Sequence, residues 1–249
     1  MTNFWSIVNS VIRDADVILL LLDARLVNET RNIEIENRVK SIGKALIYVI
    51  TKSDLVDDKE LVEKYKKELK PCVFVSSKKY YGTTMLRDRI MIEAKKHKIK
   101  FPSIRVGVLG YPNVGKSSLI NAMSGGSGAP TSSMSGYTKS LQKIRADKHL
   151  LFLDTPGVIP FKEKESEKHS MIGSVDFTKV KEPDLAVMQI MKKFPGVIEA
   201  HYGTKVIKDF EKSLENIALS KNIIKSGKEA NIDKMARTIL KDWQKGKIQ

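Results

Sequence analysis

Cysteine is nearly absent from this chain: its 249 residues contain one, Cys72. No intrachain disulfide can form, which favours a reducing compartment such as the cytoplasm. The longest apolar run, Val17 to Leu22, is too short to span a bilayer. The N-terminus has no basic segment followed by an apolar stretch, so no secretory signal is expected. The sequence therefore predicts a cytoplasmic protein with no membrane contact and no disulfide partner.

Acidic residues are also scarce. The chain has 29 Asp and Glu against 44 Lys and Arg, which gives a net charge of +15. Such an excess favours polyanionic partners, mainly nucleic acid, although a lysine-rich solvated surface is the alternative. At 41% hydrophobic and 29% charged residues the composition is that of a globular protein. The length suits one α/β domain with a smaller appendage.

Apolar and amphipathic runs alternate over about the first 160 residues, which is the pattern of βαβ units and a mostly parallel sheet. Strands are expected at residues 17–22, 45–50, 72–75 and 104–109, with a strand pair at 141–146 and 150–153. Helices are expected at residues 32–42, 59–70, 83–97 and 116–123, with Thr83 or Thr84 as the N-cap of the third. The sequence thus predicts an α/β domain over residues 1–180.

Beyond residue 179 strand runs vanish and helical periodicity takes over. Residues 185–194 predict one helix, and Phe210, Leu214 and Ile217 mark another. A third runs from Ile232 to Trp243, with Asn231 as its N-cap. We therefore expect a small all-α domain over residues 181–249.

Residues 110–117 fit the phosphate loop GxxxxGK[ST] at every position, between an expected strand and an expected helix. Lys116 is expected to bridge β- and γ-phosphate oxygens, and Ser117 to ligate Mg²⁺. Backbone N–H groups of the loop and the helix N-terminus would hold the phosphates. The residues assigned to this contact are Asn113, Val114, Gly115, Lys116, Ser117 and Ser118.

Residues 154–157, Asp-Thr-Pro-Gly, fit the DxxG element of GTPases, although such a run alone is often an ordinary turn. Asp154 is expected to hold Mg²⁺ through a water, and the Gly157 N–H to sense the γ-phosphate. Thr138 lies between the two motifs, where a γ-phosphate-dependent Mg²⁺ ligand belongs. The catalytic groups are thus Lys116, Thr138 and Gly157, and the metal ligands Ser117, Thr138 and Asp154.

A guanine-reading motif precedes the phosphate loop instead of following it. Residues 51–54, Thr51, Lys52, Ser53 and Asp54, differ from Asn-Lys-x-Asp by Thr for Asn. Asp54 would accept hydrogen bonds from the guanine ring N–H and exocyclic amine, and the Lys52 stem would pack along the base. Backbone groups of Ser76, Ser77 and Lys78 would support the base. A chance match, in a P-loop ATPase or kinase, is the alternative.

In this order, the motifs resemble the circularly permuted GTPases of large-ribosomal-subunit assembly, the YlqF-type family. Further matches are Asp23-Ala24-Arg25, Tyr137-Thr138-Lys139-Ser140 and, more weakly, residues 242–248. The resemblance implies a circularly permuted P-loop GTPase fold and hydrolysis of GTP to GDP with Mg²⁺. It also implies binding to rRNA of the large subunit and its assembly intermediates as a nucleotide-dependent checkpoint.

Two positions bear on catalysis. Val158 stands where ordinary switch GTPases have a water-orienting Gln, a trait that the family shares. Some family members are thought to use an N-terminal histidine, but residues 2–10 contain none, and His169 is a weak substitute. We therefore expect a low intrinsic rate that the large ribosomal subunit stimulates. The alternative is a nucleotide-gated RNA-binding module with negligible turnover.

Asn113 matches family members that recruit K⁺ beside the phosphates, with a hydrogen bond inside the loop as the alternative. The chain runs from the DxxG element directly into the helical region. We expect γ-phosphate binding to reposition that region.

The helical region is rich in lysine and is expected to bind rRNA phosphates, with a solvated helix face as the alternative. The lysines are Lys205, Lys208, Lys212, Lys221, Lys225, Lys228, Lys234, Lys241, Lys245 and Lys247.

Overall fold

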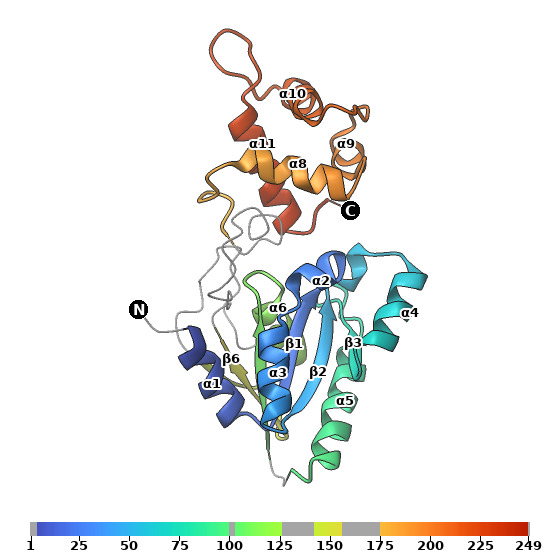
Figure 1. Ribbon diagram of the computed structural model, residues 1–249, viewed down its shortest axis with the longest axis vertical. Coiled ribbons are helices and arrows are strands. Elements are labelled where there is room, and N and C mark those ends of the chain that lie inside the picture. The colour runs from blue at the N-terminus through green and yellow to red at the C-terminus, as the bar shows by residue number, and fades with distance from the viewer. Residues whose placement is uncertain (1–3, 100–102, 126–141, 156–174, 249) are drawn as a thin grey trace. The chain divides into compact units, whose positions relative to one another are not determined.

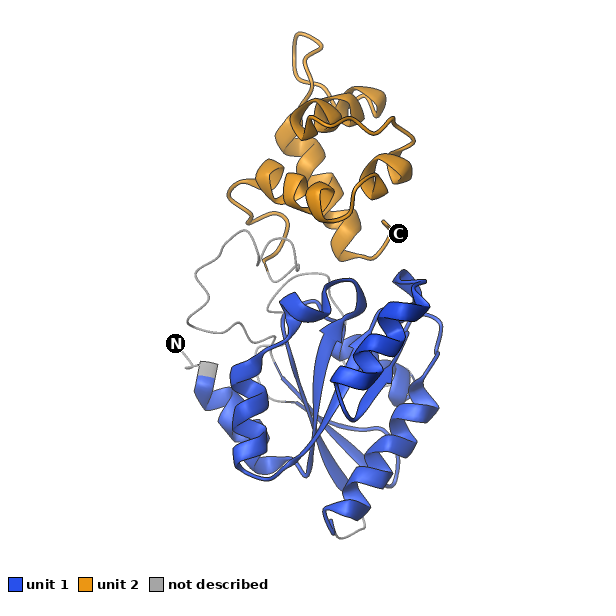
Figure 2. Cartoon of the chain, turned by 45° about the vertical axis from the view of Figure 1, so that its right-hand side comes forward, with its two compact units in different colours: residues 1–163 blue, residues 164–249 orange. Residues whose placement is uncertain are grey.

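The computed structural model describes residues 4–99, 103–125, 142–155 and 175–248. The chain divides into two compact units, residues 1–163 and 164–249 (Figure 2). The sequence analysis placed the boundary between the two domains at residue 180. That the first domain binds GTP and the second binds RNA stays a prediction.

The first unit is built on a six-stranded sheet in the order β3-β2-β1-β4-β6-β5 (Figure 1). Its strands are β1 (Val17–Asp23), β2 (Ala45–Thr51), β3 (Cys72–Phe74), β4 (Ile104–Gly110), β5 (Gln142–Arg145) and β6 (Leu150–Asp154). All neighbours pair in parallel except β5 and β6, which are antiparallel. The expected α/β class and mostly parallel sheet are confirmed.

Helices surround the sheet because its central strands are apolar on both faces. Every residue of β1 and β2 is buried, which is typical of a parallel sheet covered on both sides. Ile18, Leu20 and Leu22 share one core cluster with Val11 of α1 (Phe4–Asp14) and Val39 of α3 (Ile33–Ser41). Leu19 and Leu21 point to the opposite face because side chains alternate along a strand.

Three further helices of this unit follow the predicted positions closely: α4 (Lys59–Glu68), α5 (Thr83–Lys96) and α6 (Lys116–Met123). The short helices η1 (Ala24–Leu26), α2 (Val27–Thr30) and η2 (Ser53–Leu55) were not predicted. The prediction missed α1, although its buried residues Val8, Val11 and Ile12 recur at helical spacing.

The predicted N-cap of α5 is wrong. Gly82, with φ 78°, precedes the helix, and neither Thr83 nor Thr84 caps it. A Cβ at Gly82 would lie 2.1 Å from the Phe74 carbonyl oxygen, so only glycine fits there. The close approach of backbone to backbone therefore decides this helix start, and local capping propensity does not.

In its described residues, the second unit has helices as its regular elements and one isolated bridge, between Ile224 and Ala230. The helices are α8 (Pro183–Lys193), α9 (Val197–Tyr202), α10 (Phe210–Ser220) and α11 (Ile232–Gln244). Trp243 of α11 is 2% exposed, and its ring centroid lies 5.1 Å from that of Phe194. Asn231 caps α11 as expected, accepting a hydrogen bond from the Lys234 N–H at 3.1 Å.

Among the described residues, no helix has the length and apolar character needed to cross a membrane. Cys72 begins β3 and is half-buried. Burial raises the pKa of its thiol to about 12, and the thiol, unlike the thiolate, is a poor nucleophile.

We expect iodoacetamide to alkylate Cys72 at neutral pH at least about a hundredfold more slowly in the folded protein than in guanidinium chloride, because little thiolate forms in the fold. Mass spectrometry of timed reactions measures both rates. Equal rates in the two conditions would show that the thiol is exposed and ordinary.

Candidate functional site

Four strands end at the same edge of the sheet, and each delivers one polar motif. Asp23 ends β1, Thr51 ends β2, Gly110 ends β4 and Asp154 ends β6. The chain leaves β1 toward β2 and later returns to β4 on its other side, so β1 and β4 form the topological switch point. Open α/β sheets bind their ligands at such a point, outside the carboxyl ends of the strands.

The phosphate loop leaves β4 and enters α6 through a backbone that two glycines permit. A Cβ at Gly110 would lie 2.9 Å from the Leu21 carbonyl oxygen. Gly115 has φ 99° and directly precedes Lys116, the first residue of α6. Asn113 adopts φ 59°, a left-handed conformation that asparagine tolerates better than most residues. The first-turn N–H groups of α6 have no acceptor within their helix and favour an anion there.

Lys116 is the buried cation of this loop. Its ammonium donates to the carbonyl oxygens of Gly110 at 3.2 Å and Tyr111 at 2.7 Å. Burial lowers the pKa of Lys116 to about 8, and the negative charge of Asp154 partly opposes that shift. The group is therefore held inside the loop by weak carbonyl acceptors that phosphate oxygens can replace.

Ser117 and Asp154 provide oxygen ligands suited to Mg²⁺. The Ser117 hydroxyl donates to Asp154 Oδ2 at 3.3 Å. Asp154 is fully buried, and its Oδ1 has no hydrogen-bond partner among the described residues. Burial raises the pKa of Asp154, while Lys116 and Ser117 act against this. Protein Mg²⁺ sites next to phosphates commonly use one carboxylate and one hydroxyl with waters, so the residues fit the metal.

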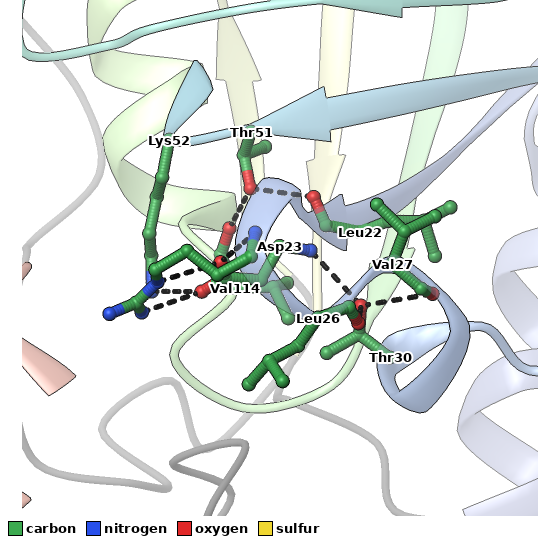
Figure 3. Close-up of polar contacts among 9 residues, drawn as sticks. Leu22, Asp23, Leu26, Val27, Thr30, Thr51, Lys52 and Val114 are labelled. Atoms are coloured by element: carbon green, nitrogen blue, oxygen red, sulfur yellow. Dashed lines mark hydrogen bonds and ion pairs between the residues drawn. The ribbon is translucent and has the colours of Figure 1, made fainter. Parts of the chain in front are cut away.

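Thr51 joins residues 51–54, the segment predicted to read guanine, to the phosphate loop (Figure 3). Its hydroxyl lies 2.6 Å from the Val114 carbonyl oxygen and 2.9 Å from that of Leu22. The residue is 2% exposed. Its hydroxyl is thus bonded to protein carbonyls, and a contact of Thr51 with the nucleotide stays a prediction. Here Thr51 holds two segments together that are far apart in sequence.

The rest of this segment, residues 52–54, lies beside residues 76–78, which follow β3 and are called the serine loop below. Asp54 lies in η2, partly exposed, and its carboxylate makes no hydrogen bond within the described chain. The Ser53 N–H donates to the Val75 carbonyl oxygen at 3.3 Å. Ser76 follows Val75 and is buried. The structure thus brings the two predicted base-contacting segments together.

Two other predicted members of the serine loop differ in exposure. Ser77 is half-buried and Lys78 is exposed. In the phosphate loop Val114 is fully buried, whereas Ser118 is exposed on the first turn of α6. Thr138 and Gly157, with Val158 and His169, lie outside the described residues.

Asp23 and Arg25 form a buried charge cluster to which the sequence analysis assigned no role. Asp23 Oδ2 accepts from the Lys52 ammonium at 2.7 Å and from Arg25 at 2.9 Å. Asp23 Oδ1 accepts from the Arg25 backbone N–H and Nε, each at 3.1 Å. Burial alone would raise the pKa of Asp23, but the charges of Arg25 and Lys52 outweigh it and hold that pKa well below its usual range.

This cluster fixes Lys52, which has φ 54°, against the end of β1. Asp23 and Thr51 are directly paired in the parallel register of β1 and β2. One sequence signal could have identified this charge cluster. It is an acidic residue at the end of one buried strand, together with a Thr-Lys pair at the end of the neighbouring strand.

The family model described as 50S ribosome-binding GTPase matches residues 105–245, more than half of the chain. The chain belongs to this family. It is 38% identical over 97% of its length to a GTP-binding protein of Methanocaldococcus jannaschii, of which the match covers 65%. It is 32% identical to nucleolar GTP-binding protein 2 of Neurospora crassa, with 98% of this chain and 40% of that protein covered. It is 30% identical to the GTPase grn1 of Schizosaccharomyces pombe, with 96% of this chain and 59% of that protein covered. The chain therefore spans only part of the curated relatives it matches.

Solved structures share the fold of this family member. GDP-bound YlqF superposes with a TM-score of 0.65 at 19% identity, covering 96% of this chain and 94% of that one. GNP-bound YlqF from T. maritima gives 0.64 at 19% identity, with 96% and 92% covered. The expected circularly permuted GTPase fold is confirmed.

We expect Asp23→Asn to lower the free energy of unfolding by about 3 kcal/mol, because Arg25 and Lys52 would lose their shared counter-charge in a buried place. Guanine-nucleotide affinity should fall about tenfold as Lys52 loses its anchor. Urea unfolding and nucleotide titration measure the two effects.

Asp16→Asn is the matched control at the other end of β1. Asp16 and Arg105 form a bidentate ion pair, as Asp23 and Arg25 do, but half of the Arg105 side chain is exposed. Such a pair contributes about 1 kcal/mol or less, and nucleotide affinity should not change. Equal losses in the two variants would contradict the role given to burial.

Proposed function

We propose that this edge of the sheet binds GTP with Mg²⁺ and hydrolyses it to GDP and phosphate. The observation that carries the proposal is the 2.6 Å contact between the Thr51 hydroxyl and the Val114 carbonyl oxygen. It joins the segment that holds Asp54 to the loop that holds Lys116. One nucleotide can therefore extend between the two segments, with its base at Asp54 and its phosphates at Lys116.

At the base, Asp54 would accept hydrogen bonds from the guanine ring N–H and exocyclic amine. Lys52, held by Asp23 at 2.7 Å, would lay its stem along the purine. Ser53 and the serine loop, with Ser76, Ser77 and Lys78, would close the other side. Adenine has no exocyclic amine at that position, so a site of this kind rejects ATP by leaving Asp54 unpaired.

At the phosphates, Lys116 would exchange its carbonyl acceptors for β- and γ-phosphate oxygens. Backbone N–H groups from Asn113 to Ser118 would surround the β-phosphate. Mg²⁺, when bound through Ser117 and the water shell of Asp154, offsets the negative charge of the transferring group. Thr138 and Gly157 are proposed to meet the γ-phosphate, and Asn113 to help recruit K⁺.

Turnover by this site is proposed to be slow until the large ribosomal subunit completes it. Val158 is aliphatic and cannot orient a water, and no histidine stands at residues 2–10. Support comes from the family model, described as 50S ribosome-binding GTPase, and from a relative that is named nucleolar GTP-binding protein 2. We propose that the chain acts as a nucleotide-dependent checkpoint in assembly of that subunit, in the cytoplasm.

Contact with rRNA is proposed for the second unit. Every lysine named above for the helical region is exposed. Among the residues that the structure describes, two of them have acidic partners: Lys212 lies 3.6 Å from Asp209 and Lys247 2.9 Å from Asp242. Most of the others are available to phosphates, and binding of this kind falls steeply with salt.

Asp54→Ala should abolish the preference for guanine. We expect wild-type protein to bind GTP far more tightly than ATP or ITP, because ITP lacks the exocyclic amine. In the variant, GTP and ITP should bind with nearly equal affinity, in each case through the phosphates. Isothermal titration with the three nucleotides measures this, and Asp58→Ala, an exposed helix cap nearby, is the control. Equal binding of ATP and GTP by the wild type would instead favour a P-loop ATPase.

Replacing Lys221, Lys225 and Lys228 with Gln should weaken binding to large ribosomal subunits about tenfold or more and reduce the salt dependence, because three phosphate contacts are lost. Sedimentation with GDP and with a non-hydrolysable GTP analogue, at several salt concentrations, measures this. Replacing Lys95, Lys96 and Lys98 near the end of α5 makes the same charge change in the first unit. Equal losses would mean that net charge alone drives binding.

The same protein and large ribosomal subunits can be used to distinguish a GTPase from a nucleotide-binding module that does not hydrolyse GTP. Large subunits should raise the GTP hydrolysis rate of the wild type strongly. A rate that stays negligible with saturating subunits would favour the nucleotide-gated RNA-binding module.

A further inference from the structure

The turn that follows β3 exposes two adjacent aromatic rings. Tyr80 is 66% exposed and Tyr81 is 59% exposed. Tyrosines on a folded protein ordinarily bury most of their ring, because each carries a large apolar area. Neither phenol hydroxyl forms a hydrogen bond, and neither ring stacks on another, within the described part of the chain.

The turn that presents these rings is held firmly. Ser76 and Tyr81 exchange two backbone hydrogen bonds, each 3.0 Å long. The Ser76 hydroxyl also accepts from the Lys79 N–H at 3.1 Å. Tyr80 adopts φ 52°, which costs a non-glycine residue about 1 kcal/mol or more. A flexible loop would relax such a conformation, so the surrounding bonds impose it and fix where the rings project.

Gly82 closes the turn from the other side. With the Phe74 carbonyl oxygen 2.1 Å from where its Cβ would be, the turn lies directly against β3. A backbone held in this way loses little conformational freedom when a ligand stacks on the rings that it carries, which favours binding.

Charge on the turn is of one sign. Lys78 and Lys79 precede the tyrosines and are both exposed. No acidic residue occurs between Ser76 and Met85. Exposed aromatic faces beside lysines are the combination that binds unpaired nucleotides, with bases on the rings and phosphates on the ammonium groups.

We propose that Tyr80 and Tyr81 form a stacking platform for unpaired bases of RNA, with Lys78 and Lys79 contacting the adjoining phosphates. The platform is a second RNA contact, on the first unit, and it rests on the proposed function in rRNA binding. Unlike the lysines of the second unit, it distinguishes single-stranded from duplex RNA, because paired bases offer no free face.

The position of this platform ties it to the nucleotide site. Ser76 and Ser77 begin the same turn and are proposed to support the guanine base. Ser76 is buried at 1% exposure, whereas Tyr80, four residues on, projects into solvent. One rigid turn therefore carries the base support at its buried end and the RNA platform at its exposed end.

The test uses the full chain and a fluorescent, unstructured single-stranded RNA of about twelve nucleotides, a length that spans a typical single-strand site. The Tyr80→Ala/Tyr81→Ala double variant should bind it about tenfold or more weakly than the wild type. Tyr80→Phe/Tyr81→Phe should bind as the wild type does, since stacking needs the ring and not the hydroxyl. Met85→Ala, on a side chain 58% exposed beside the turn, is the control and should change nothing.

A duplex RNA of the same length, and GDP, provide the discriminating readouts. Both should bind the double Ala variant and the wild type equally, which also shows that the variant is folded. If the single strand binds both proteins equally while the wild type keeps its salt-sensitive RNA binding, the platform is refuted and the proposed function stands. If the wild type binds neither the single-stranded nor the duplex RNA, the stacking platform and the proposed function in rRNA binding are both refuted. Loss of ribosomal-subunit binding by the Ala variant, with its single-strand affinity intact, would assign the rings to a protein partner and overturn the proposal.

Discussion

The buried Thr51 hydroxyl holds the nucleotide site together. It lies within hydrogen-bond distance of two carbonyl oxygens, one at the end of β1 and one in the phosphate loop. Its contact with Val114 links the segment that contains Asp54 directly to the loop that contains Lys116, across 63 residues of sequence. A single hydroxyl proton can satisfy one of the two carbonyls at a time, so the contact is strong but adaptable. Asparagine, the usual residue at this position, would bring two donors to the same place.

The sheet explains how a permuted chain can still build this site. Parallel strands deliver their carboxyl ends to one edge whatever their order along the chain, and β1 separates β2, which ends at Thr51, from β4, which leads into the phosphate loop. Motif order in the sequence changes only which strand the chain visits first. What permutation does change is the order of segments along the chain: the DxxG element, residues 154–157, is followed in sequence by the second unit.

Much of this could be predicted from the sequence. Buried strands such as Val17–Asp23 are continuous apolar runs, and glycine, lysine and serine at fixed spacing identify the phosphate loop because phosphate imposes that spacing. Contacts between distant segments were not predictable. The Asp23–Lys52 pair depends on strand register, and the glycine that starts α5 depends on how closely β3 approaches. The contact of the Thr51 hydroxyl with the phosphate loop was not predictable either, because a sequence shows which groups are polar but not which of them the protein itself uses.

Lys52, Asn113 and Tyr80 share a feature beyond their separate places in the molecule: each is a non-glycine residue with positive φ, between 52° and 59°. In Lys52 and Tyr80 this conformation costs about 1 kcal/mol or more of backbone strain, whereas asparagine at position 113 tolerates it better. Glycine would relieve the strain but would also give the unfolded chain more conformational freedom, so its two effects on stability oppose each other. Any gain in thermal stability from glycine would therefore be small, and at position 52 it would remove the ammonium group that Asp23 binds.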